Sequence, residues 1–193
     1  DEMSTQDIDH WDSVISESSL VVVDTNIPVK VIEYITEKYR NIPLFLDPVS
    51  FAKTSKVLAL IGKFHTVKPN RLEAELISGI KITDEASMLK AAKIIFEKGC
   101  RQIFITLGQE GVFYFDGKEY GLYVFEGANV KSANGAGDAF TAGVVYGHLK
   151  LSSIKETAQF ASAAAVIALR SKNTISEKLS EQSVKLLLKE EKL

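Results

Sequence analysis

The chain contains the run Ser19-Leu20-Val21-Val22-Val23-Asp24, in which apolar residues lead directly into a carboxylate. Residues 43–47, 64–68 and 102–106 form similar short runs. Stretches with the amphipathic spacing of helices separate these runs. Strands that are apolar throughout are buried on both faces, as in a parallel sheet that helices cover on either side. The sequence therefore predicts an α/β fold with a mostly parallel sheet.

The segments between these runs predict helices and one hairpin. Pro28 suits the first turn of a helix, and Asp116-Gly117 suits the turn of a hairpin. The expected helices span residues 28–39, 52–61, 71–78, 85–98, 137–149, 154–170 and 178–189, and the expected hairpin strands span residues 111–115 and 121–125. Because 193 residues suit one α/β domain, we expect a single domain.

The composition is that of an ordinary globular protein and excludes several classes of function. Hydrophobic residues make up 46% and charged residues 25% of the chain, and the net charge of −2 gives no basic footprint for nucleic acid. Cys100 is the single cysteine, so we expect a buried structural thiol and no internal disulfide. The three histidines, His10, His65 and His148, match no metal-ligand spacing. No apolar run approaches the roughly 20 residues that span a bilayer, so we expect a cytoplasmic protein with no membrane partner.

Polar residues follow the ends of the predicted strands. Ligands of parallel α/β sheets bind beyond the carboxyl ends of the strands, so these residues are candidates for a binding site. Helix capping and turn formation are the alternative explanation for about half of them. The residues are Asp24 with Asn26, Asp47, Lys68 with Asn70, and Thr106 with Gly108.

The sharpest feature is the segment Asn134-Gly135-Ala136-Gly137-Asp138-Ala139-Phe140, which continues into the apolar helix of residues 137–149. The free N–H groups at the start of a helix, together with glycines that allow close approach, form an anion site. A carboxylate inside an anion site repels phosphate, so Asp138 suits a base that takes a proton from an attacking hydroxyl. An ordinary glycine turn at a helix start is the alternative.

Residues 135–140, followed by Gly143, resemble the C-terminal signature of the PfkB family of carbohydrate kinases, the ribokinase family. The resemblance implies a ribokinase-like three-layer α/β/α fold, with ATP and Mg²⁺ as cofactors. It implies that Gly135, Ala136 and Gly137 form an anion hole for the transferred phosphoryl group and that Asp138 is the catalytic base. The implied activity is transfer of the ATP γ-phosphoryl group to a hydroxyl of a small sugar or nucleoside.

Two further segments match the family in the same order. Asn70-Arg71-Leu72-Glu73 is similar to its Asn-x-x-Glu motif, which implies that Asn70 and Glu73 support the phosphates and magnesium, with Glu73 acting through water. A capping box is the alternative for this pair. Thr106-Leu107-Gly108-Gln109-Glu110-Gly111-Val112 resembles the loop that contacts ATP, which implies nucleotide contacts from Thr106, Gly108 and Gly111. A hairpin entry is the alternative for the two glycines.

Some details resemble the pseudouridine kinase subgroup, which implies the 5′-hydroxyl of pseudouridine as the acceptor. The matching segments are residues 24–28, 47–50, 68–75 and 173–176. The family usually places an Asp where this chain has Ser132. That departure argues against ribokinase or fructokinase, and against a monovalent-cation site built on that Asp. Asn173 borders the implied adenine pocket, where it contacts the nucleotide or caps a helix.

By the same resemblance, residues 1–193 form the C-terminal, nucleotide-binding part of a ribokinase-like domain. The family has an N-terminal glycine-containing strand and a β-sheet lid, which supply much of the sugar pocket and often the contact of a homodimer. From the resemblance we expect residues 1–193 not to include them. Two alternatives therefore stay open: a PfkB-type kinase of ribose or fructose, and a non-catalytic nucleotide-binding fragment. A hydride-transfer enzyme is disfavoured because no Gly-x-Gly-x-x-Gly follows the first strand.

Overall fold

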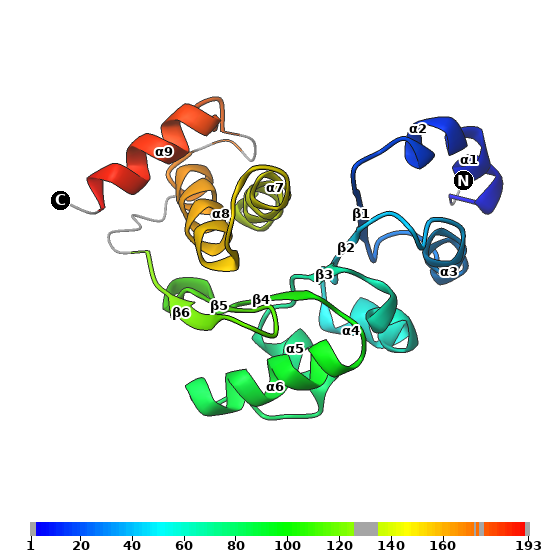
Figure 1. Cartoon of the computed structure of the whole chain (residues 1–193), viewed down its shortest axis with the longest axis horizontal. Coiled ribbons are helices and arrows are strands. Elements are labelled where there is room, and N and C mark those ends of the chain that lie inside the picture. The colour runs from blue at the N-terminus through cyan, green and yellow to red at the C-terminus, as the bar shows by residue number, and fades with distance from the viewer. Residues whose placement is uncertain (1–2, 126–134, 172, 174–175, 192–193) are drawn as a thin grey trace. The chain divides into compact units, whose positions relative to one another are not determined.

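The computed structural model describes residues 3–125, 135–171, 173 and 176–191 (Figure 1). Six strands form a sheet in the order β1-β2-β3-β4-β5-β6. The pairs β1–β2, β2–β3 and β3–β4 are parallel, which confirms the mostly parallel sheet expected from the apolar runs. The chain divides into two compact units. Unit 1 comprises Asp1–Thr106 with Phe115–Lys118, and unit 2 comprises Leu107–Tyr114 with Glu119–Leu193.

Unit 1 alternates short strands with helices. Its strands are β1 (Val21–Asp24), β2 (Leu44–Asp47), β3 (Thr66–Val67) and β4 (Gln102–Thr106). Its helices are α1 (Thr5–His10), α2 (Asp12–Ser16), α3 (Val29–Lys38), α4 (Phe51–Thr54), the 3-10 helix η1 (Ser55–Lys63), α5 (Arg71–Ser78) and α6 (Glu85–Glu97). The interior of β4 is fully enclosed, with Ile103, Phe104 and Ile105 each 0% exposed, whereas Val22 of the edge strand β1 is 44% exposed. The burial of the inner strands explains why they are apolar throughout rather than alternating.

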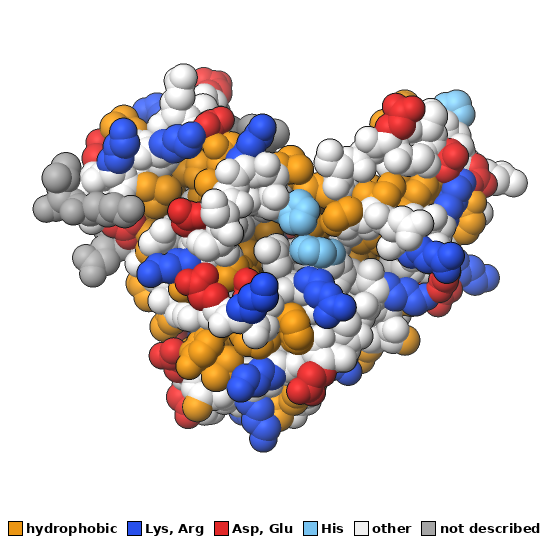
Figure 2. Space-filling view, viewed as in Figure 1, with side chains coloured by type: hydrophobic (Ala, Val, Ile, Leu, Met, Phe, Trp, Pro, Cys, Tyr) orange, Lys and Arg blue, Asp and Glu red, His pale blue; other side chains and the backbone are white. Residues whose placement is uncertain are grey.

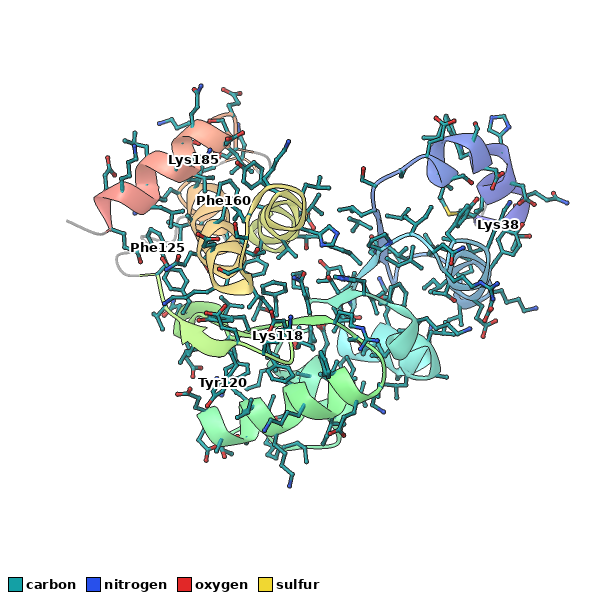
Figure 3. The ribbon with its side chains drawn as sticks, in the orientation of Figure 1. Lys38, Lys118, Tyr120, Phe125, Phe160 and Lys185 are labelled. Carbon is teal, nitrogen blue, oxygen red and sulfur yellow. The ribbon has the colours of Figure 1, made fainter. Side chains whose placement is uncertain are left out.

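The expected elements are found with three corrections, the first of which is that the strand expected over residues 64–68 is only the two-residue β3. The helix expected over residues 52–61 is instead the short α4 followed by η1. Helices α1 and α2 were not predicted, because the acidic N-terminal stretch shows little apolar periodicity. A capping box between Ser4 and Asp7 starts α1. Lys38 of α3, labelled in Figure 3, forms ion pairs with Asp9 and Asp12 and so fastens this stretch to α3.

Unit 2 contains a turn of 3-10 helix, part of the hairpin and three helices. The elements are η2 (Gly108–Glu110), β5 (Val112–Phe115, whose last residue belongs to unit 1), β6 (Tyr120–Tyr123), α7 (Ala136–Lys150), α8 (Ile154–Leu169) and α9 (Glu181–Glu190). The expected hairpin and its Asp116-Gly117 turn are confirmed, and Gly117 has a φ of 88°. Helix α8 lies between α7 and α9 (Figure 1).

Small residues let α7 and α8 pack closely. A Cβ at Gly143 would lie 2.4 Å from Cα of Ala161, and a Cβ at Gly147 would lie 2.4 Å from Cγ2 of Thr157. The alanines of α8 thus serve close packing. On the other side of α8, Phe160 anchors a cluster with Val184 and Leu187 of α9, against which Phe125 packs (Figure 3).

The distribution of surface charge and the burial of the cysteine are as the sequence predicts. Figure 2 shows Lys and Arg side chains interspersed with Asp and Glu over the visible face. Within the described residues, none of the helices combines the length and the apolar character needed to span a bilayer. Cys100 is 0% exposed, and burial raises the pKa of its thiol to about 12, so it is the expected structural thiol.

Candidate active site

In unit 1, polar residues gather where parallel strands end. The register pairs Asp24 at the end of β1 with Asp47 at the end of β2. The Nζ of Lys68, just beyond β3, lies 3.1 Å from Oδ2 of Asp47, and these side chains are only 12% and 16% exposed. Because solvent screens charges weakly at such a position, the attraction between these two charges is stronger than in an ion pair on the open surface. It holds a cation and a carboxylate at the carboxyl edge of the sheet.

The turn after β2 holds a strained residue. Val49 has a φ of 63° and is the only non-glycine residue with positive φ in the described part of the chain. The N–H of Val49 donates to Oδ1 of Asp47 at 3.2 Å, and the N–H of Ser50 donates to the carbonyl of Pro48 at 2.7 Å. A β-branched residue in this conformation costs about 1–3 kcal/mol and is typical of functional sites. Neither this strain nor the Asp47–Lys68 pair could be read from the sequence.

Asn70 and Glu73 lie together at the start of α5, as the sequence predicted. They form a capping box in which Asn70 Oδ1 accepts from the Glu73 N–H at 3.0 Å. The Glu73 carboxylate accepts from the Asn70 N–H and from its Nδ2, each at 2.8 Å. Glu73 is 2% exposed, and burial raises the pKa of its carboxyl against the lowering effects of the Asn70 N–H and Lys68. The capping alternative is therefore confirmed as one function of this pair.

Thr106 joins this group through the backbone. Asn70 and Thr106 form an isolated parallel bridge, and the N–H of Thr106 donates to the carbonyl of Pro69 at 2.9 Å. Its hydroxyl lies 3.5 Å from the same carbonyl oxygen. The fold therefore brings Asn70, Glu73 and Thr106 together at the ends of β3 and β4, beside the Asp47–Lys68 pair.

The two glycines of the following loop belong to unit 2 and differ from each other. Gly108 has a φ of 63°, and a Cβ there would meet nothing within 4 Å. Gly111 has a φ of 99°, and its Cβ would lie 2.1 Å from the carbonyl oxygen of Tyr123. Gly108 therefore leaves open space for a ligand, whereas Gly111 lets the hairpin strands approach, as the hairpin alternative supposed.

The glycine turn of unit 2 starts α7 without a side-chain cap. Gly135 is the N-cap residue with a φ of 81°, and no side chain caps the helix within the described residues. By contrast, α5, α6, α8 and α9 each begin with a capping box. No described side chain therefore occupies the first N–H groups of α7, an arrangement that suits an anion.

The side chain of Asp138 is exposed in the first turn of this helix. A Cβ at Gly137 would meet nothing within 4 Å, so this glycine is not required by packing. Ala136 is half-buried. Ser132 and Asn134, on which part of the predicted resemblance rests, lie outside the described residues. The turn thus presents open backbone and a carboxylate at one point, which suits a phosphoryl group and a base.

Asn173 is exposed in the segment between α8 and α9. Its N–H donates to Oγ of Ser171 at 3.1 Å. Because the C-cap of α8 is Arg170 and the N-cap of α9 is Ser180, Asn173 caps neither helix. Its contact with a nucleotide stays a prediction.

The donor set fits phosphates and a sparsely held magnesium ion. In the described part of the chain, no three His, Cys, Asp or Glu side chains gather to hold a metal. Magnesium keeps most of its waters and needs few carboxylates. Asp47 and Glu73 are carboxylates at this edge of unit 1, and both oxygens of Glu73 accept hydrogen bonds from Asn70. Contact of Glu73 with magnesium through water stays a prediction.

A cavity of about 500 Å³ lies at the end of β1 in unit 1. Asn26 and Lys53 line it, and Lys53 donates to Oδ1 of Asn26. Asn26 is itself fixed by Asp24, which accepts from its N–H at 2.7 Å and from its Nδ2 at 2.8 Å. Ile27 and Val57 add apolar wall. A volume of this size suits a small organic ligand.

Comparison with known proteins gives concordant matches. The model of the pfkB family carbohydrate kinases matches residues 2–181. Pseudouridine kinase of Escherichia coli is 33% identical over 171 residues, which are 88% of this chain and 55% of that protein. A Clostridium perfringens protein described as a sugar kinase has a crystal structure that matches with a TM-score of 0.93 at 34% identity, over 97% of this chain and 60% of that one.

The ribokinase of Arabidopsis thaliana, solved with ribose and ATP, matches with a TM-score of 0.77 at 23% identity, over 97% of this chain and 60% of that one. This match confirms the expected ribokinase-like fold. The chain spans about half the length of the pseudouridine kinase that it matches.

Proposed function

Because the chain belongs to the pfkB family of carbohydrate kinases, we propose that it forms the nucleotide-binding and catalytic part of an ATP-dependent kinase. The acceptor is a hydroxyl of a sugar or nucleoside. The observation that carries this proposal is the start of α7. There the exposed Asp138 follows the N-cap residue Gly135, which has a left-handed conformation and offers no side chain to cap the helix. A carboxylate within an anion site is unfavourable for binding alone and useful for removing a proton.

In the proposed reaction, Asp138 accepts the proton of the acceptor hydroxyl. The hydroxyl oxygen forms a bond to the γ-phosphorus of ATP while the bond between that phosphorus and the β–γ bridging oxygen breaks, and ADP leaves. The N–H groups of Ala136 and Gly137 stabilise the charge on the transferring group. Gly135 makes the left-handed turn that allows this approach.

The residues at the strand ends take supporting roles in the proposal. Asn70 and Thr106 position the phosphates, and Glu73 orders a hydrated magnesium ion that would neutralise phosphate charge. Gly108 gives the nucleotide room at the loop, Gly111 shapes that loop, and Asn173 borders the adenine. Lys68, held by Asp47 at 3.1 Å, adds a cation suited to phosphate.

For the substrate we propose pseudouridine, phosphorylated on its 5′-hydroxyl. The support is the 33% identity to a pseudouridine kinase, together with the segments around Asp24, Asp47, Lys68 and Asn173. The cavity beside Asn26 combines amide and ammonium groups with apolar wall, which suits the polar edge and the faces of a base. A sugar kinase acting on ribose or fructose is the second candidate, favoured by the likeness to the Clostridium sugar kinase.

The test is an assay of the full-length protein with Mg-ATP and pseudouridine, uridine, ribose or fructose at equal concentration. Formation of ADP is measured with and without each acceptor. Turnover with pseudouridine and not with uridine, ribose or fructose is the expected result. Turnover confined to ribose or fructose would keep the kinase and reject the nucleoside. Failure to bind ATP and to turn over any acceptor would favour a non-catalytic module. A homodimer is part of the proposal, and the molar mass in solution tests it.

A further inference from the structure

A second hollow lies at the opposite edge of the unit 1 strands from the candidate site. Its volume is about 270 Å³. Leu44, the first residue of β2, lines it, whereas Asp47 at the other end of β2 contacts Lys68. The hollow is therefore formed at the amino ends of the strands, and the kinase chemistry proposed above makes no use of it.

Three cationic residues from three separate segments line this hollow. They are Arg40, which follows α3, Lys63 at the end of η1, and Arg101, which precedes β4. Lys63 is paired with Glu37. Within the described part of the chain, neither Arg40 nor Arg101 forms an ion pair. The Lys63 hydrogen bond and then the nearby positive charges of Lys63 and Arg40 lower the pKa of Glu37, so this carboxylate stays ionised and neutralises one cation. Of the three positive charges of Arg40, Lys63 and Arg101, two therefore remain without a neutralising carboxylate among the described residues.

The walls of the hollow are fixed by close backbone packing. A Cβ at Gly62 would lie 1.8 Å from the carbonyl oxygen of Lys98, and a Cβ at Gly99 would lie 2.3 Å from that of Gly62. Cys100 adds a contact from its Sγ to the Ile61 carbonyl at 3.1 Å. The two segments that carry Lys63 and Arg101 are therefore held together before any ligand arrives.

Arg101 is itself oriented. Its guanidinium carbon lies over the ring of Phe96, 5.8 Å from the ring centroid, and the Arg101 backbone N–H donates to the carbonyl of His65 at 2.8 Å. An arginine held by stacking loses less conformational freedom when it binds an oxyanion, and its planar fork matches phosphate oxygens.

We propose that this hollow binds a phosphoryl group, either as free phosphate or as the phosphate of a small ester. Two uncompensated arginines match the near-dianionic charge of a phosphoryl group at neutral pH. Ile42 and Pro43 line the hollow beside the arginines and leave an apolar surface for the organic part of an ester. The ligand class follows from this charge and shape and is independent of the substrate of the kinase.

The test is a titration of the full-length protein with inorganic phosphate and, separately, with glycerol 3-phosphate, at constant ionic strength and without ATP. Amide proton–nitrogen correlation spectra report where each ligand binds. Saturable shifts of Gly62, His65 and Gly99, distinct from any shifts of Gly135 to Gly137, are the expected result. Tighter binding of the ester indicates a phosphorylated metabolite, and equal binding indicates free phosphate.

Two double variants each remove two positive charges, one from the hollow and the other from the surface of α6. Arg40→Gln with Arg101→Gln should weaken binding by about tenfold or more. Lys90→Gln with Lys93→Gln removes two exposed cations of α6 that do not line the hollow and should leave binding unchanged. Equal loss in both double variants, or no saturable shift at Gly62 and Gly99 in the unmodified protein, would overturn the proposal. Arg40→Gln alone, at an exposed position, gives the same comparison if the double variant is unstable.

Discussion

The carboxylate of Glu73 accepts two hydrogen bonds from Asn70, one from its backbone N–H and one from its Nδ2, both at 2.8 Å. Asn70 in turn caps α5 through the Glu73 N–H at 3.0 Å. The pair that resembles a phosphate-supporting motif is thus also the cap of a helix. A single substitution there should change both the stability of the protein and its binding of ATP. A substitution in a second capping box of the same unit separates these two effects.

Asn70→Ala should lower the free energy of unfolding by about 1 kcal/mol, because it removes the cap of α5. It should also weaken ATP binding, because Asn70 lies with Thr106 at the proposed phosphate site. Asp84 caps α6 with the same kind of box, so Asp84→Ala should destabilise the protein and leave ATP affinity unchanged. Urea unfolding and an ATP titration measure both effects. Equal ATP affinity in the two variants would contradict the assignment of Asn70.

The buried Glu73 carboxyl should make stability depend on pH. Its pKa is raised above 4.5 chiefly by burial, so the folded state binds this proton more tightly than the unfolded state. The contribution is fully present below pH 4.5 and is lost as the pH rises through the folded pKa. Glu73→Gln should flatten the pH dependence of the urea midpoint in that window.

Asp84 is a control because its pKa is shifted in the opposite direction to that of Glu73. Hydrogen bonds from Ser87, first from its backbone N–H, lower the Asp84 pKa below 3.8, so its contribution is present above that pH and is lost as the pH falls through the folded pKa. Asp84→Asn should therefore leave the pH dependence of the urea midpoint above pH 4.5 unchanged. A Glu73→Gln profile parallel to that of the unmodified protein would show that Glu73 is not responsible.

Two glycines of the signature segment should respond oppositely to alanine. A Cβ at Gly137 meets nothing, so Gly137→Ala should keep or raise stability, by about 0.5–1 kcal/mol at most, while its methyl group impedes phosphate and weakens ATP binding. A Cβ at Gly143 lies 2.4 Å from Cα of Ala161, so Gly143→Ala should cost about 1–3 kcal/mol by overpacking α7 against α8. Thermal unfolding and ATP titration check the pair. ATP binding unchanged in Gly137→Ala would remove Gly137 from the phosphate site.

The sequence predicted most of the fold because its inner strands are buried on both faces and its first strand is also apolar in succession. Residues such as Val21 to Val23 and Ile103 to Ile105 are apolar in succession, and this signal needs no tertiary information. Helices α1 and α2 were not predicted because their acidic residues form ion pairs with Lys38, which is distant in sequence, and local sequence does not reveal such contacts. The 3-10 character of η1 was missed because its apolar spacing resembles that of an α-helix.

The candidate site was predictable only where local sequence determines it. The capping box of Asn70 and Glu73 and the turn at Gly135 are local, so short motifs revealed them. The ion pair of Asp47 with Lys68 depends on the register of neighbouring strands, and the positive φ of Val49 breaks the usual preference of a β-branched residue. The distinction between Gly108 and Gly111 depends on the approach of Tyr123. These features become visible only when the chain is folded.

Asp138 as the base is the central element of the proposed reaction. The decisive measurement is ADP formation by full-length Asp138→Asn with the acceptor on which the unmodified protein turns over, alongside ATP affinity. Glu85→Gln is the matched control, since Glu85 is an exposed carboxylate in the first turn of α6. We predict that Asp138→Asn lowers turnover by about 100-fold or more with ATP affinity unchanged or higher, because a like charge is removed from the phosphate site, and that Glu85→Gln turns over normally. Turnover of a folded Asp138→Asn protein at the unmodified rate would contradict the account.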